Sequence, residues 1–420
     1  MDQSVHRVWP YREVEVFTSR ELEKQLAVLS ESELRVLVVG AGIAGTTAAQ
    51  LLRSSGIRPV LVDGTGPDAN AGYMIALMPM VDAAIKQLGA RGAYQDGSTR
   101  MDRYRVLSHR GTALRQDSLA ALLAEYGQYR GLSRAALLDA LSVGGCDVAW
   151  HTRVSSLAES GAGVAVTFET PDGGRAADFD VVIIADGIHS ATRRFVPGGR
   201  SPQTTVTGWG GWVSWAPADA EPDLGEELWG DGFFVGSYPV KGAVGAFIGG
   251  PRADLADGPS AFVDRIRNAL TASTPRLRRV LEAMDAAEDP FFWVLDDVRT
   301  DRWATGRTVL LGDAAAGFLP TAGIGAGMAI ESAWVLCNTL TGAAPGGVAE
   351  RLARYEAAQK PRVEAAQSNS RQLARLMFRR STLLAHVRNT AMRFVSVDVA
   401  LAPIRKLLDE PAVIPSAGVD

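Results

Sequence analysis

The sequence has few cysteines and no long apolar run. Its two cysteines, Cys146 and Cys337, cannot build a disulfide framework and lack metal-site spacing, a pattern typical of a reducing compartment. No segment reaches the roughly 18 apolar residues of a membrane span, since glycines and a proline interrupt even the apolar stretch 314–330. The first residues also lack the apolar core of a signal peptide. We therefore expect a cytoplasmic protein without integral membrane association.

An excess of positive charge is also missing. The 420 residues include 43 Lys plus Arg against 47 Asp plus Glu, which gives a formal charge of −4. This balance supplies no broad basic field for phosphates and argues against nucleic acid as a partner. At about 150 residues per domain, the length predicts two or three domains.

Apolar runs at 34–39 and 59–63 flank a Gly-rich turn and a segment with helical spacing at 44–55. Fully apolar strands of this kind predict a parallel sheet covered on both faces. From residue 204 onward, apolar and polar residues alternate and aromatic residues become frequent. This pattern indicates a second, mostly antiparallel sheet. The fold class expected is α/β, with a Rossmann-like domain, an inserted β-sheet domain and a helical C-terminal segment.

These changes in pattern set the predicted boundaries. They are an N-terminal extension (1–33), in which 19–34 could form a helix; the first part of a dinucleotide-binding domain (34–203, with a β-meander at 151–180); a substrate-binding sheet domain (204–300) that also draws on 72–115; the return of the first domain (301–345); and C-terminal helices (346–420).

The first candidate site is the turn Gly40-Ala41-Gly42-Ile43-Ala44-Gly45 between a strand and a helix. Glycines here allow a tight turn and close approach of backbone N–H groups to a pyrophosphate at the helix N-terminus. Asp63 ends the next strand, where an acid can accept hydrogen bonds from a ribose. Together these features predict dinucleotide binding; the alternative is a Gly-rich turn without a ligand.

Two further apolar strands deliver an aspartate to their carboxyl ends. The first precedes Asp186-Gly187, and the second precedes Gly312-Asp313 and continues to Pro320, Gly323 and Gly325. Open α/β sheets bind ligands at this edge. Either aspartate alone could simply cap a turn, but three such strand ends in one chain favour a shared ligand.

In this combination and order, the sequence resembles the FAD-dependent monooxygenases of the aromatic-hydroxylase (group A) family, over about residues 34 to 395. The matching elements are the three glycines of the first turn, Asp186-Gly187, Gly312-Asp313, the helix that begins near Arg134, and Tyr355-Glu356 with Pro361-Arg362.

The resemblance implies FAD as cofactor and gives the residues roles. Asp63, beside Gly64, would hold the adenosine ribose, Arg134 would reach the phosphate and ribose region, and Asp313 would bind the ribityl chain. Asp186 would serve both FAD and a transient NADPH or NADH. The helix near Ile324, Gly325 and Ala326 would point its N-terminus at the flavin, where its dipole stabilises the anion of the reduced ring. Arg134 could instead be a solvated helix residue.

The sequence departs from the family pattern around the last turn. Ala316 stands where many members have His, Ile324 where Gln is usual and Gly327 where Asn is usual, and Ser332 replaces an Asp. Backbone contacts are unaffected by these changes, and we expect an unusually apolar pocket.

The resemblance also implies the reaction. NAD(P)H would reduce FAD, O₂ would form a flavin C4a-hydroperoxide, and one oxygen atom would pass to a hydrophobic, aromatic or polycyclic metabolite. We expect no catalytic side chain and no metal site. The backbone near Pro320, Gly323 and Gly325 is instead expected to lie close to the flavin ring. Substrate contacts are expected from the aromatic region, although ordinary sheet core is the alternative; the candidates are Trp212, Trp215, Phe234, Tyr238 and Phe247.

Three other functions share this fold. A flavin-dependent halogenase is one, although Trp212-Val213-Ser214-Trp215-Ala216-Pro217 matches that family's tryptophan motif only loosely. An FAD-dependent reductase or dehydrogenase is another, and a non-catalytic dinucleotide-fold binding protein is the third.

Between 365 and 397 arginines alternate with apolar residues and no acid occurs. This stretch could touch anionic lipid, but we favour a helix packed against the chain's own FAD-binding domain.

Overall fold

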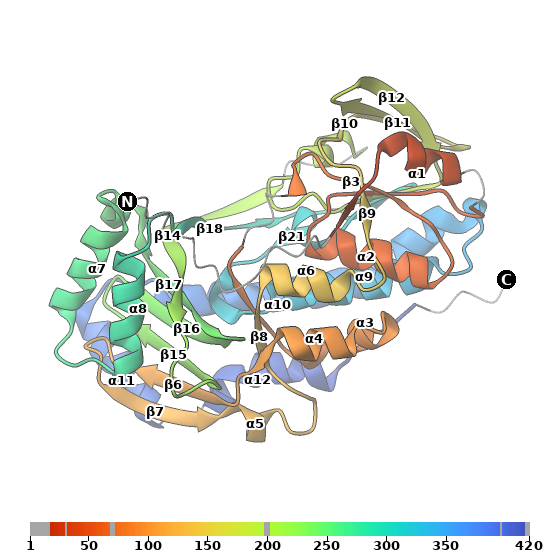
Figure 1. Cartoon of the computed structure of the whole chain (residues 1–420). Coiled ribbons are helices and arrows are strands. Elements are labelled where there is room, and N and C mark those ends of the chain that lie inside the picture. The colour runs from red at the N-terminus through yellow and green to blue at the C-terminus, as the bar shows by residue number, and fades with distance from the viewer. Residues whose placement is uncertain (1–16, 30–31, 68–71, 197–201, 395–396, 416–420) are drawn as a thin grey trace.

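The computed structural model describes residues 17–29, 32–67, 72–196, 202–394 and 397–415 (Figure 1). Most of the predicted N-terminal extension lies outside these ranges. Within it, the helix expected at 19–34 is a shorter α1 (Leu22–Leu29). Among the described residues, no helix is long and apolar enough to cross a membrane, and no cluster of His, Cys, Asp or Glu could hold a metal ion.

The first sheet is parallel except at one edge. Its order is β19-β20-β13-β2-β3, and only β19 runs antiparallel to its neighbour. The strands are β2 (Val36–Val39), β3 (Val60–Val62), β13 (Val181–Ile184), β19 (Ala304–Thr305) and β20 (Thr308–Leu310). Every residue of β2, β3, β13 and β20 is buried, as the unbroken apolar runs predict.

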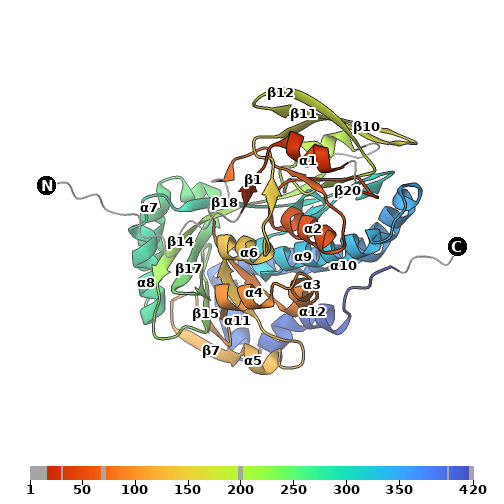
Figure 2. The ribbon, with the colours of Figure 1, turned by 45° about the vertical axis from the view of Figure 1, so that its right-hand side comes forward.

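Helices and a small antiparallel sheet cover the two faces of this parallel sheet. Helices α2 (Ile43–Ser54) and α9 (Gly325–Leu340) pack together on one face. The meander of β10 (Arg153–Ser160), β11 (Gly163–Thr170) and β12 (Gly173–Phe179) lies on the other side (Figures 1 and 2). It matches the meander predicted at 151–180.

The second sheet has eight strands in the order β21-β18-β14-β17-β16-β15-β6-β7. Its strands are β6 (Arg103–Leu107), β7 (Ala113–Ser118), β14 (Gln203–Pro217), β15 (Leu224–Trp229), β16 (Phe234–Val240), β17 (Ala243–Pro251), β18 (Phe291–Arg299) and β21 (Ala316–Gly317). Strands β6 and β7 come from the region before residue 119, and β6 joins the sheet by parallel pairing with β15.

The two faces of this sheet have different partners. Helices α7 (Gly258–Ala269) and α8 (Pro275–Asp285) cover the outer face, where Trp212 and Ile248 pack with Phe262. On the other face, which we call the inner face, Phe234 and Phe247 pack with Leu319, which precedes α9, and with Ala374 and Met377 of the helix at 348–377. Because side chains alternate along a strand, neighbouring residues face these two different environments.

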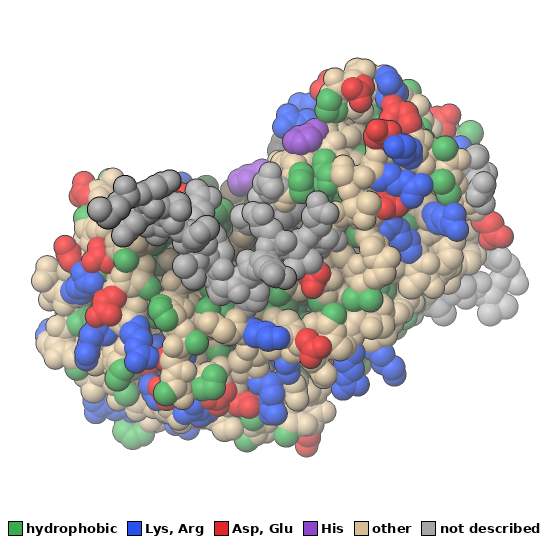
Figure 3. Space-filling model, viewed as in Figure 1, with side chains coloured by type: hydrophobic (Ala, Val, Ile, Leu, Met, Phe, Trp, Pro, Cys, Tyr) green, Lys and Arg blue, Asp and Glu red, His purple; other side chains and the backbone are tan. Residues whose placement is uncertain are grey.

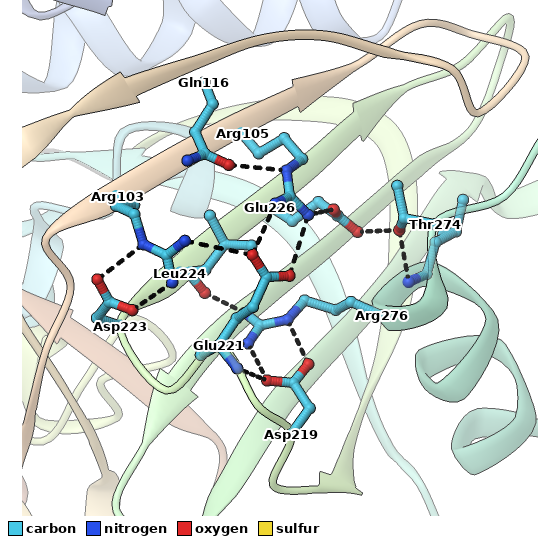
Figure 4. Close-up of polar contacts among 11 residues, drawn as sticks. Arg103, Arg105, Gln116, Asp219, Glu221, Asp223, Leu224, Glu226, Thr274 and Arg276 are labelled. Carbon is cyan, nitrogen blue, oxygen red and sulfur yellow. Dashed lines mark hydrogen bonds and ion pairs between the residues drawn. The ribbon is translucent and has the colours of Figure 1, made fainter.

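A network of ion pairs and hydrogen bonds links the start of β15 to β6 and α8 (Figure 4). The guanidinium of Arg276 is 2% exposed and lies 2.6 Å from Asp219, and it also donates to the carbonyls of Glu221 and Leu224. Arg105 pairs with Glu221 at 2.7 Å and with Glu226 at 3.0 Å. Hydrogen bonds to Arg276 hold the pKa of Asp219 below its usual value, against the opposing effect of burial.

The other short elements lie within the first 148 residues. They are β1 (Thr18–Ser19), β4 (Met74–Leu77), β5 (Thr99–Arg100), β8 (Arg130–Ser133), β9 (Asp147–Val148), α3 (Asp82–Gln87), α4 (Arg91–Gly97), α5 (Leu119–Leu122) and α6 (Arg134–Leu141). Strands β4, β8 and β5 form a sheet of their own.

The C-terminal helices are α10 (Val348–Met377), α11 (Thr382–Phe394) and α12 (Val397–Asp409). Helix α10 packs on α9, as expected, and α11 contacts β7 of the large sheet. The guanidinium of Arg388 donates to the carbonyls of Trp229 and Gly230, and Arg371 lies 2.6 Å from the fully buried Asp297. These arginines have partners on the large sheet, which corrects the expectation that the basic stretch packs on the FAD-binding domain with its arginines solvated or facing the acidic N-terminal segment. Figure 3 shows Lys and Arg interspersed with Asp and Glu over one face of the molecule.

Candidate active site

A single cavity of about 1210 Å³ extends from the carboxyl ends of the parallel strands to the inner face of the large sheet. Gly42, Gly187 and Asp313 line one part of it, and Phe234 and Phe247 line another. Because β2, β13 and β20 are adjacent and parallel, the turns that follow them lie side by side. The three turns predicted from the sequence therefore meet at one site.

The glycines of the first turn do two different things. Gly40 has φ +103°, and a Cβ there would lie 2.5 Å from the carbonyl oxygen of Ala185. A Cβ at Gly45 would lie 1.8 Å from the carbonyl oxygen of Gly40. Both positions therefore allow close packing of β2, α2 and β13. Gly42 instead opens onto the cavity, with the Arg134 guanidinium 3.9 Å from its would-be Cβ.

Asp63, at the end of β3, stabilises this turn by accepting a backbone hydrogen bond. Its Oδ2 accepts a 2.7 Å hydrogen bond from the backbone N–H of Ala41, and its Oδ1 accepts from the N–H and hydroxyl of Thr65. Neither Asp63 nor Gly64 is among the cavity-lining residues, and Gly64 lies against the side chain of Arg153. A carboxylate has about four acceptor positions, so the expected ribose contact is still available to Asp63.

Arg134 lines the cavity, whereas Asp186 lies between the lining residues Ala185 and Gly187 and does not line it itself. Arg134 begins α6, whose N-cap Ser133 accepts a 3.1 Å hydrogen bond from the N–H of Ala136, and its side chain lines the cavity. Asp186 accepts from the N–H of Thr192 through Oδ2, while its buried Oδ1 has no hydrogen-bond partner. Such an orphaned oxygen is unusual in a folded protein and indicates a missing donor.

Asp313 is a carboxyl group whose pKa is changed by its position in the site. Its side chain is accessible, but it opens into the cavity, where protein surrounds it. The resulting desolvation raises the pKa of Asp313 to about 6, and the charge of Arg193 partly opposes this shift. This carboxyl group therefore changes charge around pH 6.

The loop before α9 completes this end of the cavity. Pro320, Gly323, Gly325 and Ala326 line it, as do Ile43 and Ala44 at the start of α2. Ile324, in contrast, is 2% exposed and packs into the core. No side chain caps the N-terminus of α9, so its first N–H groups and its dipole are available to an acceptor in the cavity.

The aromatic candidates divide between the two faces of the large sheet. Phe234, Tyr238 and Phe247 line the cavity. Trp212 faces the outer side, where its ring lies 6.2 Å from that of Phe262, and half-buried Trp215 does not line the cavity. Alternation along β14 explains the position of Trp212, since it is one residue away from the inner-face residue Val213.

Sequence reasoning missed a polar group on the inner face. Glu227 and Trp229, at alternate positions of β15, and Tyr104 of β6 line the cavity. The spacing of Glu227 and Trp229 could have indicated a shared face, but nothing in the sequence pairs them with Tyr104. Of the positions that depart from the family pattern, Ala316 is buried in the core and Gly327 lies beneath Met80. These departures leave the loop before α9 apolar. Glu227, in contrast, makes the opposite side of the cavity polar.

These residues fit a flavin nucleotide. A dinucleotide needs a turn where the backbone can approach phosphates, acceptors for ribose or ribityl hydroxyls, and donors for the ring. Gly42 and Gly187 leave open space in the cavity where side chains would otherwise intrude. Cavity-facing Asp313 supplies an acceptor and the uncapped α9 supplies donors, and the orphaned oxygen of Asp186 belongs to the residue between the lining residues Ala185 and Gly187.

This combination of a parallel sheet, an inserted antiparallel sheet and a shared cavity defines the FAD-dependent aromatic hydroxylases. Residues 33–370 match the family described as FAD binding domain, and the chain belongs to that family. The resemblance noted in the sequence is thereby confirmed, and the protein is an FAD-dependent monooxygenase.

Individual relatives support this assignment. The chain is 34% identical over 370 residues to 3-amino-4-hydroxybenzoate 2-monooxygenase PtnB3 of Streptomyces platensis, covering 82% of this chain and 88% of the relative. It is 30% identical over 340 residues to FAD-dependent urate hydroxylase of Klebsiella pneumoniae, covering 79% and 87%. The crystal structure of Klebsiella pneumoniae HpxO with FAD and uric acid superposes with a TM-score of 0.77 at 26% identity, covering 91% of this chain and 97% of that one.

Proposed function

We propose that the enzyme uses NADPH or NADH and O₂ to hydroxylate a small aromatic compound bound against the inner face. The observation that carries this proposal is the single cavity, which joins the strand-end turns to Phe234 and Phe247. The related enzymes named for 3-amino-4-hydroxybenzoate and for urate support a planar, nitrogen- or oxygen-substituted ring as substrate.

In this proposal the parallel-sheet parts, 34–203 and 301–345, hold FAD. Asp63 and Arg134 would bind its ribose and phosphates, and Asp186 and Asp313 would accept from its hydroxyls or amides. The N–H groups at the start of α9 would face the ring and stabilise negative charge on it. When bound, FAD supplies electron transfer from NAD(P)H and activation of O₂.

The substrate-binding part consists of 204–300 together with β6 and β7. Phe234, Phe247 and Trp293 line the cavity with apolar surface. Their task is to position the ring and to keep water from the reacting oxygen, which would otherwise be lost as peroxide.

The halogenase alternative gains no support from the fold. Its tryptophan motif would place Trp212 at the active site, but Trp212 packs into the hydrophobic cluster between the large sheet and the helices on its outer face. Among the described residues that line the cavity there is also no lysine.

A coupling assay tests the proposal. The FAD-loaded enzyme is mixed with NADPH or NADH and a panel of hydroxylated and aminated aromatic compounds, and nicotinamide oxidation, product and hydrogen peroxide are measured together. A substrate should stimulate oxidation and give product in near-equal amount. Stimulation with peroxide as the sole product across the whole panel would contradict the proposed reaction for this class of substrate.

The raised pKa of Asp313 predicts a pH dependence of FAD binding. Hydroxyl donors favour the ionised carboxylate, so bound FAD should lower the pKa of Asp313 from its value of about 6 in the free protein. Affinity should therefore be greatest above that pKa and fall about tenfold between pH 7 and pH 5, as protons compete. Titration of apoprotein with FAD at several pH values measures this.

The matched variant is Asp313→Asn, which keeps the size of the side chain and cannot ionise. Its FAD affinity should be weaker at pH 7 and nearly constant from pH 5 to 7. An unchanged tenfold dependence in this variant would assign the effect to another group.

A further inference from the structure

Two carboxylates on the large sheet line the cavity: Asp117 pairs with Arg115 at 2.6 Å, and Glu227 is held by three hydrogen-bond donors. Its Oε2 accepts from the Tyr104 hydroxyl at 2.6 Å and from the Trp229 indole N–H at 2.9 Å. Its Oε1 accepts from the Tyr238 hydroxyl at 2.6 Å. All four side chains line the cavity, so this group is available to a ligand.

The sheet register explains why these residues converge. Strand β15 lies between β6 and β16, and Glu227 is opposite Val106 on one side and Gly236 on the other. Tyr104 and Tyr238 occupy diagonal positions two residues away on the neighbouring strands, on the same face, and long side chains reach across such diagonals. Gly236 leaves room for the Tyr238 ring, since a Cβ there would lie 2.8 Å from its hydroxyl.

The neighbouring carboxylate has a different environment. Glu226 points to the outer face, where it pairs with Arg105 at 3.0 Å and accepts from Thr274. Within the described ranges, no Lys, Arg or His forms an ion pair with Glu227. Burial raises the pKa values of Tyr104 and Tyr238, and the negative charge of Glu227 raises them further, so both tyrosines stay protonated and donate.

The lone pairs of Glu227 are not all used. A carboxylate offers about four acceptor positions, and among the described residues Oε1 accepts from the Tyr238 hydroxyl alone. A hydroxyl, amino or ring N–H group of a ligand can fill the open position with a charge-assisted hydrogen bond. A ligand carboxylate placed there would instead be repelled by the negative charge of Glu227.

We propose that Glu227 is the specificity-determining residue of a proton-donor subsite, which selects aromatic substrates that present a hydroxyl, amino or N–H group to the inner face and rejects those that present a carboxylate there. This inference rests on the proposed function in that it treats the inner face as the substrate side. Tyr104, Tyr238 and Trp229 are positioning residues that hold the carboxylate in place.

The test measures binding to the FAD-loaded enzyme by calorimetry, without turnover. Three probes share one bicyclic ring: 2-naphthol has a donor, 2-methoxynaphthalene lacks it, and 2-naphthoate is an anion. The wild type should bind 2-naphthol about tenfold or more tightly than the methyl ether, and 2-naphthoate more weakly than either.

Two variants of adjacent glutamates locate the effect. Glu227→Gln should bring 2-naphthol and its methyl ether within about threefold of each other and should strengthen binding of 2-naphthoate. Glu226→Gln should leave the wild-type order unchanged, because that residue faces away from the cavity. Tyr238→Phe, which keeps the carboxylate and removes one competing donor, should retain the preference for 2-naphthol.

Equal binding of 2-naphthol and the methyl ether by the wild type, no binding of 2-naphthol, or a preference unaltered in Glu227→Gln would each overturn the inference. These results would leave the proposed reaction standing, because it is judged by coupled product formation. Conversely, a panel without coupled product would contradict the proposed reaction while the binding order still reports on Glu227.

Discussion

Gly40→Ala should yield a protein that has lost its flavin. The new Cβ would lie 2.5 Å from the Ala185 carbonyl oxygen and 2.8 Å from Cα of Asp186, and these are backbone atoms that cannot move independently of the sheet. The turn must therefore shift away from β13, which displaces the N–H groups of α2 from the cavity. We expect FAD affinity to fall by about two orders of magnitude or more, measured by titration of apoprotein and by flavin content after purification.

Gly56→Ala is the matched control. Gly56 also has positive φ, +85°, but a Cβ there would have no neighbour within 4 Å. This variant should lose only about 1 kcal/mol of stability from backbone strain and should keep its FAD. If both variants lost FAD equally, or Gly40→Ala kept wild-type affinity, the close contact between the two strand ends would not position the cofactor.

Arg276→Met should destabilise the protein strongly without changing its flavin site. The substitution leaves Asp219, which is 6% exposed, without its cation, and leaves the carbonyls of Glu221 and Leu224 without their donor. Breaking a buried ion pair in this way typically costs about 3–5 kcal/mol. A lower urea midpoint, with wild-type FAD affinity under native conditions, is the expected result.

Arg267→Met makes the same substitution in an exposed pair. Arg267 is 37% exposed and its partner Asp285 is 35% exposed, so the loss should be about 1 kcal/mol or less. Adding Asp219→Asn to Arg276→Met should recover part of the stability, because it removes the unpaired charge. Equal midpoints for Arg276→Met and Arg267→Met would show that burial of the network does not strengthen it.

The parallel-sheet part of the site could be predicted from the sequence because its signals are local. Each of β2, β13 and β20 is an unbroken apolar run, and each ends in a turn with glycine and, at two of them, aspartate. Parallel strands place their carboxyl ends at one edge, so local patterns alone bring Gly42, Gly187 and Asp313 together.

The substrate side could not be predicted in the same way. Its composition indicated an aromatic sheet, but the face of each residue depends on register, and one position separates cavity-lining Val213 from core-packed Trp212. The carboxylate group needs Tyr104 on β6 and Glu227 on β15, which meet through a parallel pairing of distant segments. No short-range pattern specifies such a pairing.

The most direct test of the account is the origin of the oxygen atom in the product. Turnover under ¹⁸O₂ in ordinary water, followed by mass spectrometry, should place one ¹⁸O atom in each hydroxylated product molecule, and turnover under ordinary O₂ in H₂¹⁸O should place none. Product that carries label only from water, or product formed without O₂, would contradict a monooxygenase built around this cavity.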